Sequence, residues 1–308
     1  MKPDPNMRCT VIVLNFNGEH LLPACLDSLA LQTGAEIDVV VVDNGSTDGS
    51  AALVAQRYPW VRFLGLQKNC GFCLANNLAL RDALARGSDC ALLLNNDTYA
   101  AGDFISQMLT VMQSDSRIAV VCPKIYFADP VDRLWYAGGD FSLWTGATRH
   151  RGWKEIDHGQ FDRHQEITQA TGCEMLVRRS AMREVGLLDE QFWIYAEDLD
   201  WSVRFRKHGY RLAFAPKAHL WHLDGATNVK SLGKGSEAVR QFLSTRNMVF
   251  LARKHVRWWQ MPTYAPCFLL NHIAFYTALR LWRRDFRALL AIYRGLSQGL
   301  RTSLTSLG

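Results

Sequence analysis

The chain carries a short apolar run, Cys-Thr-Val-Ile-Val-Leu at residues 9–14, which ends at a polar turn, Asn-Phe-Asn-Gly at residues 15–18. A continuous apolar run of this length is typical of a strand that is buried on both faces of a parallel sheet. Residues 21–31 follow with leucines and a cysteine at helical spacing, which predicts an amphipathic helix. This stretch therefore predicts one strand followed by one helix.

The same alternation continues along the first third of the chain. Further strands are predicted over residues 37–42, 61–66 and 90–94, with one helix over residues 51–58 and another that follows a loop at residues 69–71 and ends at about residue 86. Beyond them the pattern is less regular, with strands expected at 118–122, 174–178 and 212–214, and helices from residue 180 and over 199–208. Alternating strands and helices predict an α/β fold with a mainly parallel central sheet and a ligand crevice at the carboxyl ends of its strands.

The composition is that of a globular protein. The 308 residues are 48% hydrophobic and 21% charged, which excludes a disordered chain and fits one large domain or two modest ones. Eight cysteines are too few for a disulfide scaffold, and no signal-peptide pattern is present. We therefore expect a cytoplasmic protein with reduced thiols, and we interpret the CxxC spacing of Cys70 and Cys73 as incidental.

Polar clusters follow two of the predicted strands. Asp43 comes directly after the strand at residues 37–42, where a carboxylate can bind a nucleobase or a ribose hydroxyl. Asn95, Asn96 and Asp97 follow the strand at residues 90–94 and offer the hard oxygen ligands that suit Mg²⁺ or Mn²⁺. Each cluster also fits a purely structural role, as a polar turn or a helix cap.

A third cluster, Glu197-Asp198-Leu199-Asp200-Trp201, begins a predicted helix. The helix dipole favours acidic residues there, but three acids within four positions exceed what capping needs, so one of them could act as a general base. His219 and His222 flank a tryptophan on a predicted loop. Imidazole is a ligand for Mn²⁺ and related metals, although a loop histidine is more often merely solvated.

In this order, the clusters resemble glycosyltransferase family 2, the inverting GT-A-type enzymes that use nucleotide-diphosphate sugars, and within it the rhamnosyltransferase-like branch. The resemblance spans about residues 10–253. Its matching motifs lie at residues 15–17, 42–50, 69–77, 94–98, 171–179, 186–192, 197–204 and 222. The resemblance implies a GT-A-type fold, and we expect a catalytic domain over residues 1–228, with a nucleotide half at about 8–98 and an acceptor half at about 99–228.

The resemblance also implies a role for each matching residue. Asp198 would be the catalytic base with Glu197 beside it, and Asp97 and His222 would hold Mg²⁺ or Mn²⁺, with Asn95 where the family usually has another acid. The donor-nucleotide pocket would contain Asn15, Asn17, Asp43, Asn69, Gly71, Asn77, Asn95 and Asn96. The acceptor or donor-sugar pocket would contain Thr171, Gly172, Trp193, Asp200 and Trp201, while His219 would be structural. Lys230 and Lys234, in a loop expected to be mobile, could close over the diphosphate.

The implied reaction moves a sugar from a nucleotide-diphosphate sugar to a hydroxyl of a glycan or lipid-linked glycan in cell-surface polysaccharide synthesis. dTDP-L-rhamnose is the favoured donor, and UDP-sugars stay open. Two alternatives are a non-catalytic glycan- or nucleotide-binding relative and a sugar nucleotidyltransferase. The second usually has a glycine-rich phosphate loop after its first strand, where this chain has residues 15–20, Asn-Phe-Asn-Gly-Glu-His.

Positive charge gathers in the last part of the chain, residues 229–308, which we expect to form the mobile loop and a basic, aromatic helical extension. Residues 240–308 carry eleven Lys and Arg and one acid, whereas the other residues have a net charge of −4. Residues 258–279 contain no charged side chain, and arginines and aromatics follow them. We expect residues 258–301 to attach peripherally to an anionic membrane, at the inner face of the bacterial cytoplasmic membrane. A helical cap, a homo-oligomer interface and a membrane span are alternatives, and no motif indicates specific nucleic-acid binding.

Overall fold

The computed structural model describes residues 7–223 and 236–304. Its core is a ten-stranded sheet with strand order β10-β12-β6-β11-β4-β1-β2-β3, in which β5 pairs with β12 and β7 with β6. A separate hairpin is formed by β8 (Gly139–Phe141) and β9 (Thr148–His150). The predicted α/β class, with a mainly parallel central sheet and a C-terminal helical extension, is confirmed.

Parallel strands form the first half of the sheet. Strand β1 (Arg8–Asn15) lies between β2 (Glu36–Asp43) and β4 (Cys90–Asn95), and β3 (Arg62–Gly65) extends the sheet beyond β2. Helices α1 (Leu22–Ala30), α2 (Ser50–Arg57) and α3 (Gly71–Ala85) connect them. The register places Asn15 beside Asp43 and Leu14 beside Asn95, so the polar residues after these strands meet at one edge of the sheet.

The second half of the sheet is mixed. Strand β11 (Glu174–Arg178) runs antiparallel between β4 and β6 (Ile118–Phe127), while β12 (Arg211–His222) runs parallel to β6. The short strands are β5 (Thr98–Ala100), β7 (Leu134–Tyr136) and β10 (Gln165–Ile167). Helices α4 (Phe104–Ser114), α5 (Arg179–Val185) and α6 (Glu197–Lys207) complete this half.

The predicted strand at residues 212–214 was too short. β12 has 12 residues and continues to His222, because a break in its register with β6 between Ala215 and His219 lets the strand bend and resume pairing. His219 and His222 therefore lie on a strand and not on a loop. The pairing of His222 with Thr98 on β5 carries this histidine to the edge where β4 ends.

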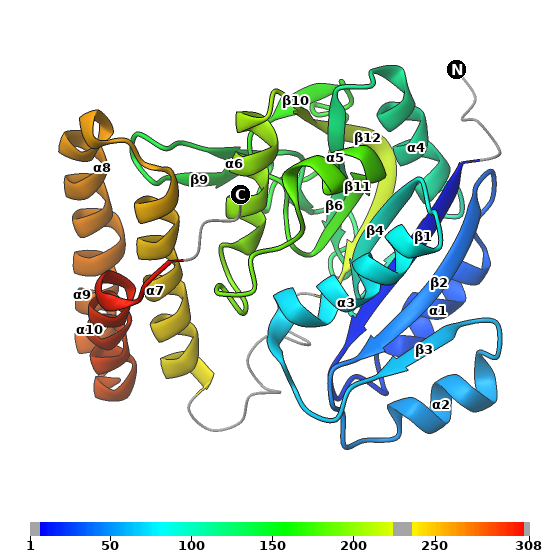
Figure 1. Ribbon diagram of the computed structural model, residues 1–308, viewed down its shortest axis with the longest axis horizontal. Coiled ribbons are helices and arrows are strands. Elements are labelled where there is room, and N and C mark those ends of the chain that lie inside the picture. The colour runs from blue at the N-terminus through cyan, green and yellow to red at the C-terminus, as the bar shows by residue number, and fades with distance from the viewer. Residues whose placement is uncertain (1–6, 224–235, 305–308) are drawn as a thin grey trace.

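The last part of the chain is helical, and Figure 1 shows these helices together on one side of the sheet. They are α7 (Ser236–His255), η1 (Trp258–Gln260), α8 (Met261–Phe268), the π-helical segment η2 (Leu269–Ala274), α9 (Phe275–Trp282) and α10 (Phe286–Arg301). Helix α10 packs closely on α7 at Gly299, where a Cβ atom would lie only 2.7 Å from the Val249 side chain. The close contact is possible because glycine has no side chain. In the described parts of the chain, no helix has the length and apolarity that crossing a membrane requires.

Candidate active site

A cavity of about 370 Å³ opens at the edge where β1 and β4 end. Ten residues of the predicted site line it: Asn69, Gly71, Asn95, Asn96, Thr171, Gly172, Trp193, Glu197, Asp198 and His222. They come from both halves of the sheet and from the start of α6. The cavity therefore joins the polar edge of the parallel strands to the acidic cluster.

Asp43 does not line this cavity but is joined to it through Asn15, which contacts the lining residue Asn96. The Asn15 amide donates to Asp43 Oδ1 at 2.8 Å and accepts from the Asn96 amide at 2.6 Å. The backbone N–H of Ser46 donates to Asp43 Oδ2 at 3.0 Å. Asn17, which adopts a positive φ of 49°, accepts from the Thr47 N–H at 2.8 Å. Asn15 and Asn17 thus hold neighbouring groups in place, and neither is among the lining residues.

Asp97 and His222 face each other next to the cavity, although they are far apart in the sequence. Asp97 Oδ1 and His222 Nε2 are 3.4 Å apart, and both side chains are buried. Burial opposes a charge on His222, but contacts with Cys173 and Asp97 raise its pKa well above the usual value. His219 instead has Nε2 3.1 Å from the Pro216 carbonyl.

The described residues contain no cluster of three His, Cys, Asp or Glu that could hold a metal by itself. A divalent ion that carries a diphosphate needs fewer protein ligands, because Mg²⁺ usually binds one or two carboxylates together with phosphate oxygens and water. One carboxylate and one imidazole converge here, and the Asn95 side chain lines the adjoining cavity. This donor set fits a metal that is bound together with its substrate.

Asp198 and Glu197 also line the cavity and lie at the first turn of α6. Asp198 accepts hydrogen bonds from the backbone N–H groups of Gly172, at 3.0 Å, and Leu199, at 2.8 Å. Burial raises the pKa of Asp198, while these N–H groups oppose the shift. Burial and the neighbouring Asp198 charge raise the pKa of Glu197 to about 8. The two N–H donors favour the charged form of Asp198, whereas the Asp198 charge disfavours the charged form of Glu197, so the two neighbouring carboxyl groups have different environments.

The loop before α6 is strained and is held in place by the C-terminal helices. Trp193, Tyr195 and Ala196 have φ values of 65°, 75° and 63°, a region that non-glycine residues seldom adopt. The Asn247 amide on α7 lies 2.8 Å from the carbonyl oxygens of Phe192, Ile194 and Tyr195. The sequence analysis missed Asn247, because no motif surrounds it.

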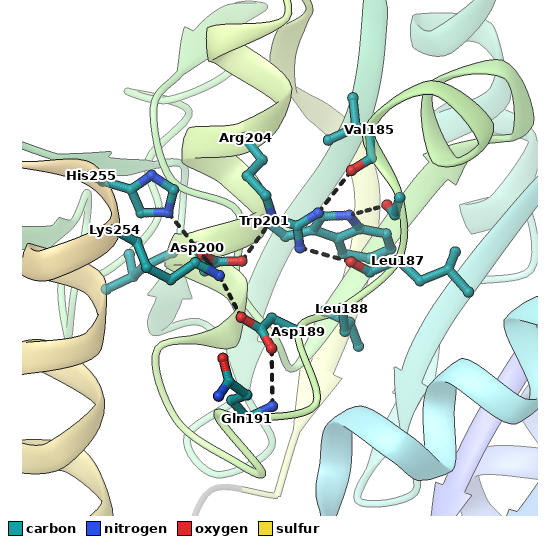
Figure 2. Close-up of polar contacts among 12 residues, drawn as sticks. Val185, Leu187, Leu188, Asp189, Gln191, Asp200, Trp201, Arg204, Lys254 and His255 are labelled. Carbon is teal, nitrogen blue, oxygen red and sulfur yellow. Dashed lines mark hydrogen bonds and ion pairs between the residues drawn. The ribbon is translucent and has the colours of Figure 1, made fainter. Parts of the chain in front are cut away.

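The placement of Asp200 and Trp201 in a substrate pocket was wrong. Asp200 is fully buried on the other face of α6, where it binds Arg204 at 2.8 Å, His255 at 2.7 Å and Lys254 at 3.3 Å. Figure 2 shows this network between α6 and α7. Trp201 is also buried and donates its indole N–H to the Gly186 carbonyl at 2.9 Å. Both residues are packed in the interior and do not line the cavity.

The placement of Asn77 in the donor pocket was also wrong. Its amide donates to the Leu188 carbonyl at 2.9 Å and accepts from the Leu188 N–H at 3.1 Å, so it ties α3 to the segment before α6.

Lys230 and Lys234 lie outside the described residues. All eight cysteines are free, and burial raises the pKa of Cys73 well above its usual value, which disfavours redox chemistry at the CxxC spacing.

Solved structures with the same architecture are glycosyltransferases of the GT-A type. GalNAc-T7 with UDP, GalNAc and Mn²⁺ superposes with a TM-score of 0.61 at 15% identity, over 82% of this chain and 48% of that one. The mannosyltransferase PcManGT from Pyrobaculum calidifontis, with GDP-Man and Mn²⁺, gives 0.56 at 19% identity, over 97% and 89%. These likenesses establish the fold as GT-A-like.

Residues 10–186 match the profile of "Glycosyl transferase family 2", and the chain belongs to this family. It is 26% identical over 304 residues to the N-acetylglucosaminyl-diphospho-decaprenol L-rhamnosyltransferase of Mycobacterium tuberculosis, covering 89% of this chain and 95% of the relative. It is 24% identical over 223 residues to the dTDP-rhamnosyl transferase RfbF of Shigella flexneri, covering 70% and 71%. The resemblance to the rhamnosyltransferase-like branch is confirmed.

Proposed function

We propose that this glycosyltransferase moves L-rhamnose from dTDP-L-rhamnose to a hydroxyl of a lipid-linked glycan, in one displacement that inverts the anomeric carbon. The observation that carries the proposal is the position of Asp198, whose buried carboxylate lines the same cavity as His222, the partner of Asp97. The choice of sugar rests on two relatives that are named rhamnosyltransferases, and the choice of a lipid-linked acceptor rests on the one named for a diphospho-decaprenol substrate. The branch and the site thus support the same reaction.

The proposed chemistry uses Asp198 and the Asp97–His222 pair. The acceptor oxygen forms a new bond to the sugar C1 while the C1–oxygen bond to the diphosphate breaks, and Asp198 takes the hydroxyl proton. The leaving group is the nucleoside diphosphate, whose terminal phosphate gains a negative charge when the C1–oxygen bond breaks. Asp97 and His222 would hold a divalent ion, which offsets the charge on the departing diphosphate. Asn15, hydrogen-bonded to Asp43, would orient that carboxylate toward the donor nucleotide.

Replacement of a metal ligand is expected to remove metal-dependent donor binding. In Asp97→Ala and His222→Ala, we expect Mn²⁺ to strengthen binding of dTDP or UDP at least about tenfold less than in the wild type, because each variant loses one of two protein ligands. Calorimetry with and without Mn²⁺ measures this effect. His219→Ala, on the same strand, is the matched control.

Unchanged metal dependence in both ligand variants would contradict the assignment of Asp97 and His222. The same titrations, run with dTDP-rhamnose and UDP-sugars, also identify the donor. Turnover of the bound sugar nucleotide separates an enzyme from a non-catalytic binding relative.

We further propose that the outer helices attach the enzyme to the inner face of an anionic membrane. Trp258, in η1, is 81% exposed and Trp282, at the end of α9, is 79% exposed. The exposed arginines of the C-terminal helices are Arg253, Arg257, Arg283, Arg284, Arg287, Arg294 and Arg301. Aromatic side chains favour the lipid boundary and arginines favour anionic headgroups.

Loss of both tryptophans is expected to weaken vesicle binding. Burial of a large apolar side chain contributes about 1.5–3 kcal/mol, so the double variant Trp258→Ala with Trp282→Ala should partition at least about tenfold less onto anionic vesicles in a flotation assay. Trp60→Ala, a tryptophan 44% exposed after α2, is the control. Equal flotation of wild type on neutral and anionic vesicles, or none at all, would contradict the proposal.

A further inference from the structure

A second cavity of about 540 Å³ lies next to the donor cavity and shares Asp198 with it. Its walls come from the tip of the β8–β9 hairpin, from α7 and from the run of helices that contains η2. The hairpin and α8 are in contact, since a side chain at Gly146 would meet the Tyr264 ring at 2.9 Å. Tyr195, Ala196 and Asp198 line both cavities, so the base stands at the boundary between them.

Two buried glutamines in this cavity have amide oxygens without a protein partner. Gln169 is 5% exposed and Gln241 is 3% exposed, and the Oε1 atom of each has no hydrogen bond among the described residues. Gln169 follows β10, whereas Gln241 is on α7. A buried polar atom without a partner costs about 1–3 kcal/mol, and native proteins contain few of them. An amide oxygen only accepts hydrogen bonds, so a partner for these two atoms has to donate them.

The other walls restrict the class of ligand. His272 lines the cavity with Nε2 3.1 Å from Thr245 Oγ1, and burial lowers its pKa to about 4, so it is uncharged at neutral pH. Arg240 is already paired with Glu237 at 3.0 Å. Phe268 and Tyr276 add aromatic rings. Neutral hydrogen-bonding groups beside aromatic rings suit a polyhydroxylated ring, and they suit neither a diphosphate nor a lipid tail.

We propose that this second cavity binds the terminal sugar of the acceptor glycan, whose hydroxyl or amide N–H groups donate to Gln169 and Gln241. The proposal rests on the proposed function, because only a transferase needs an acceptor on the far side of Asp198 from its donor. The C-terminal helices then form one wall of the acceptor site. In this arrangement the acceptor hydroxyl reaches the base from the second cavity while the donor C1 approaches from the first.

Three variants test the cavity. Gln169→Leu and Gln241→Leu keep side-chain volume and remove the accepting oxygen, and Ser244→Phe places a ring into the cavity from α7. The matched control is Gln298→Leu, an exposed glutamine on α10. The probes are methyl glycosides of hexoses and N-acetylhexosamines, observed by saturation-transfer NMR in the presence of dTDP or UDP and Mn²⁺.

We expect wild type and Gln298→Leu to bind one class of glycoside alike. Each glutamine variant should bind it about three- to tenfold more weakly, as for one lost hydrogen bond, and Ser244→Phe should not bind it. Nucleotide binding, followed by calorimetry, should be the same in all five proteins. If nucleotide binds and no glycoside does, or if Ser244→Phe binds glycoside as the wild type does, the acceptor site is wrong and the proposed function stands. If the wild type binds no nucleotide, the proposed function itself fails.

Discussion

The variant Asp198→Asn is expected to transfer sugar about 10²–10⁴-fold more slowly than the wild type, which is the usual loss when a general base is removed. Donor binding should be unchanged, because the side-chain shape is kept and an amide oxygen can still accept from the Gly172 N–H. Single-turnover transfer measures the first quantity and calorimetry with the nucleotide measures the second. Asp103→Asn, on an exposed residue at the start of α4, is the control.

The pH dependence of transfer gives a second measure of the same residue. Burial raises the pKa of Asp198 above the usual 3.8, and the carboxylate form is the base. Wild-type transfer should therefore fall as the pH drops through this raised pKa, at a higher pH than an exposed aspartate would require. Asp198→Asn should lose this acidic limb. A transfer rate close to that of the wild type, or an unchanged acidic limb, would remove Asp198 from the role of base.

The sequence could predict the polar edge of the sheet because neighbouring parallel strands end together. Asp43 and Asn95 each end a strand that pairs with β1, so local apolar runs were enough to bring them close. Asp97 and His222 needed the resemblance as well, since β5 and the bent end of β12 join them. Those contacts depend on a long-range register that a local pattern does not contain.

The prediction for Asp200 was wrong because it assigned a site role to a residue of the motif that faces away from the cavity. Two residues along a helix turn through roughly 200°, so Asp198 and Asp200 point to nearly opposite faces of α6. Helical spacing alone would have separated them. Asn247, by contrast, could not be found from the sequence, because its partners at residues 192–195 belong to a strained loop. Only the docking of α7 brings that amide to the loop.

The variant Asp200→Asn is expected to lower the free energy of unfolding by about 3–5 kcal/mol, because it removes one partner from a buried ion cluster. Asp200 is fully buried between Arg204, Lys254 and His255, and its loss leaves the buried Arg204 charge without the carboxylate with which it pairs. Urea unfolding measures the effect. The control is Asp27→Asn, which breaks an ion pair whose side chains are half exposed and should cost at most about 1 kcal/mol.

The pH dependence of this stability difference separates the ion cluster from simple packing. Burial opposes the charge on Asp200, but the hydrogen bond from His255 and the charges of Arg204 and Lys254 lower its pKa well below the usual 3.8. A lowered pKa means that the carboxylate stabilises the fold above the unfolded-state value and loses this effect as the pH falls through the folded-state value. The gap between wild type and Asp200→Asn should therefore be complete at pH 7 and narrow below about pH 4. A gap that stays constant with pH would instead indicate that the introduced amide merely packs badly.

Because the network joins α6 to α7, the same variant should also slow transfer at temperatures where it remains folded, whereas Asp27→Asn should not.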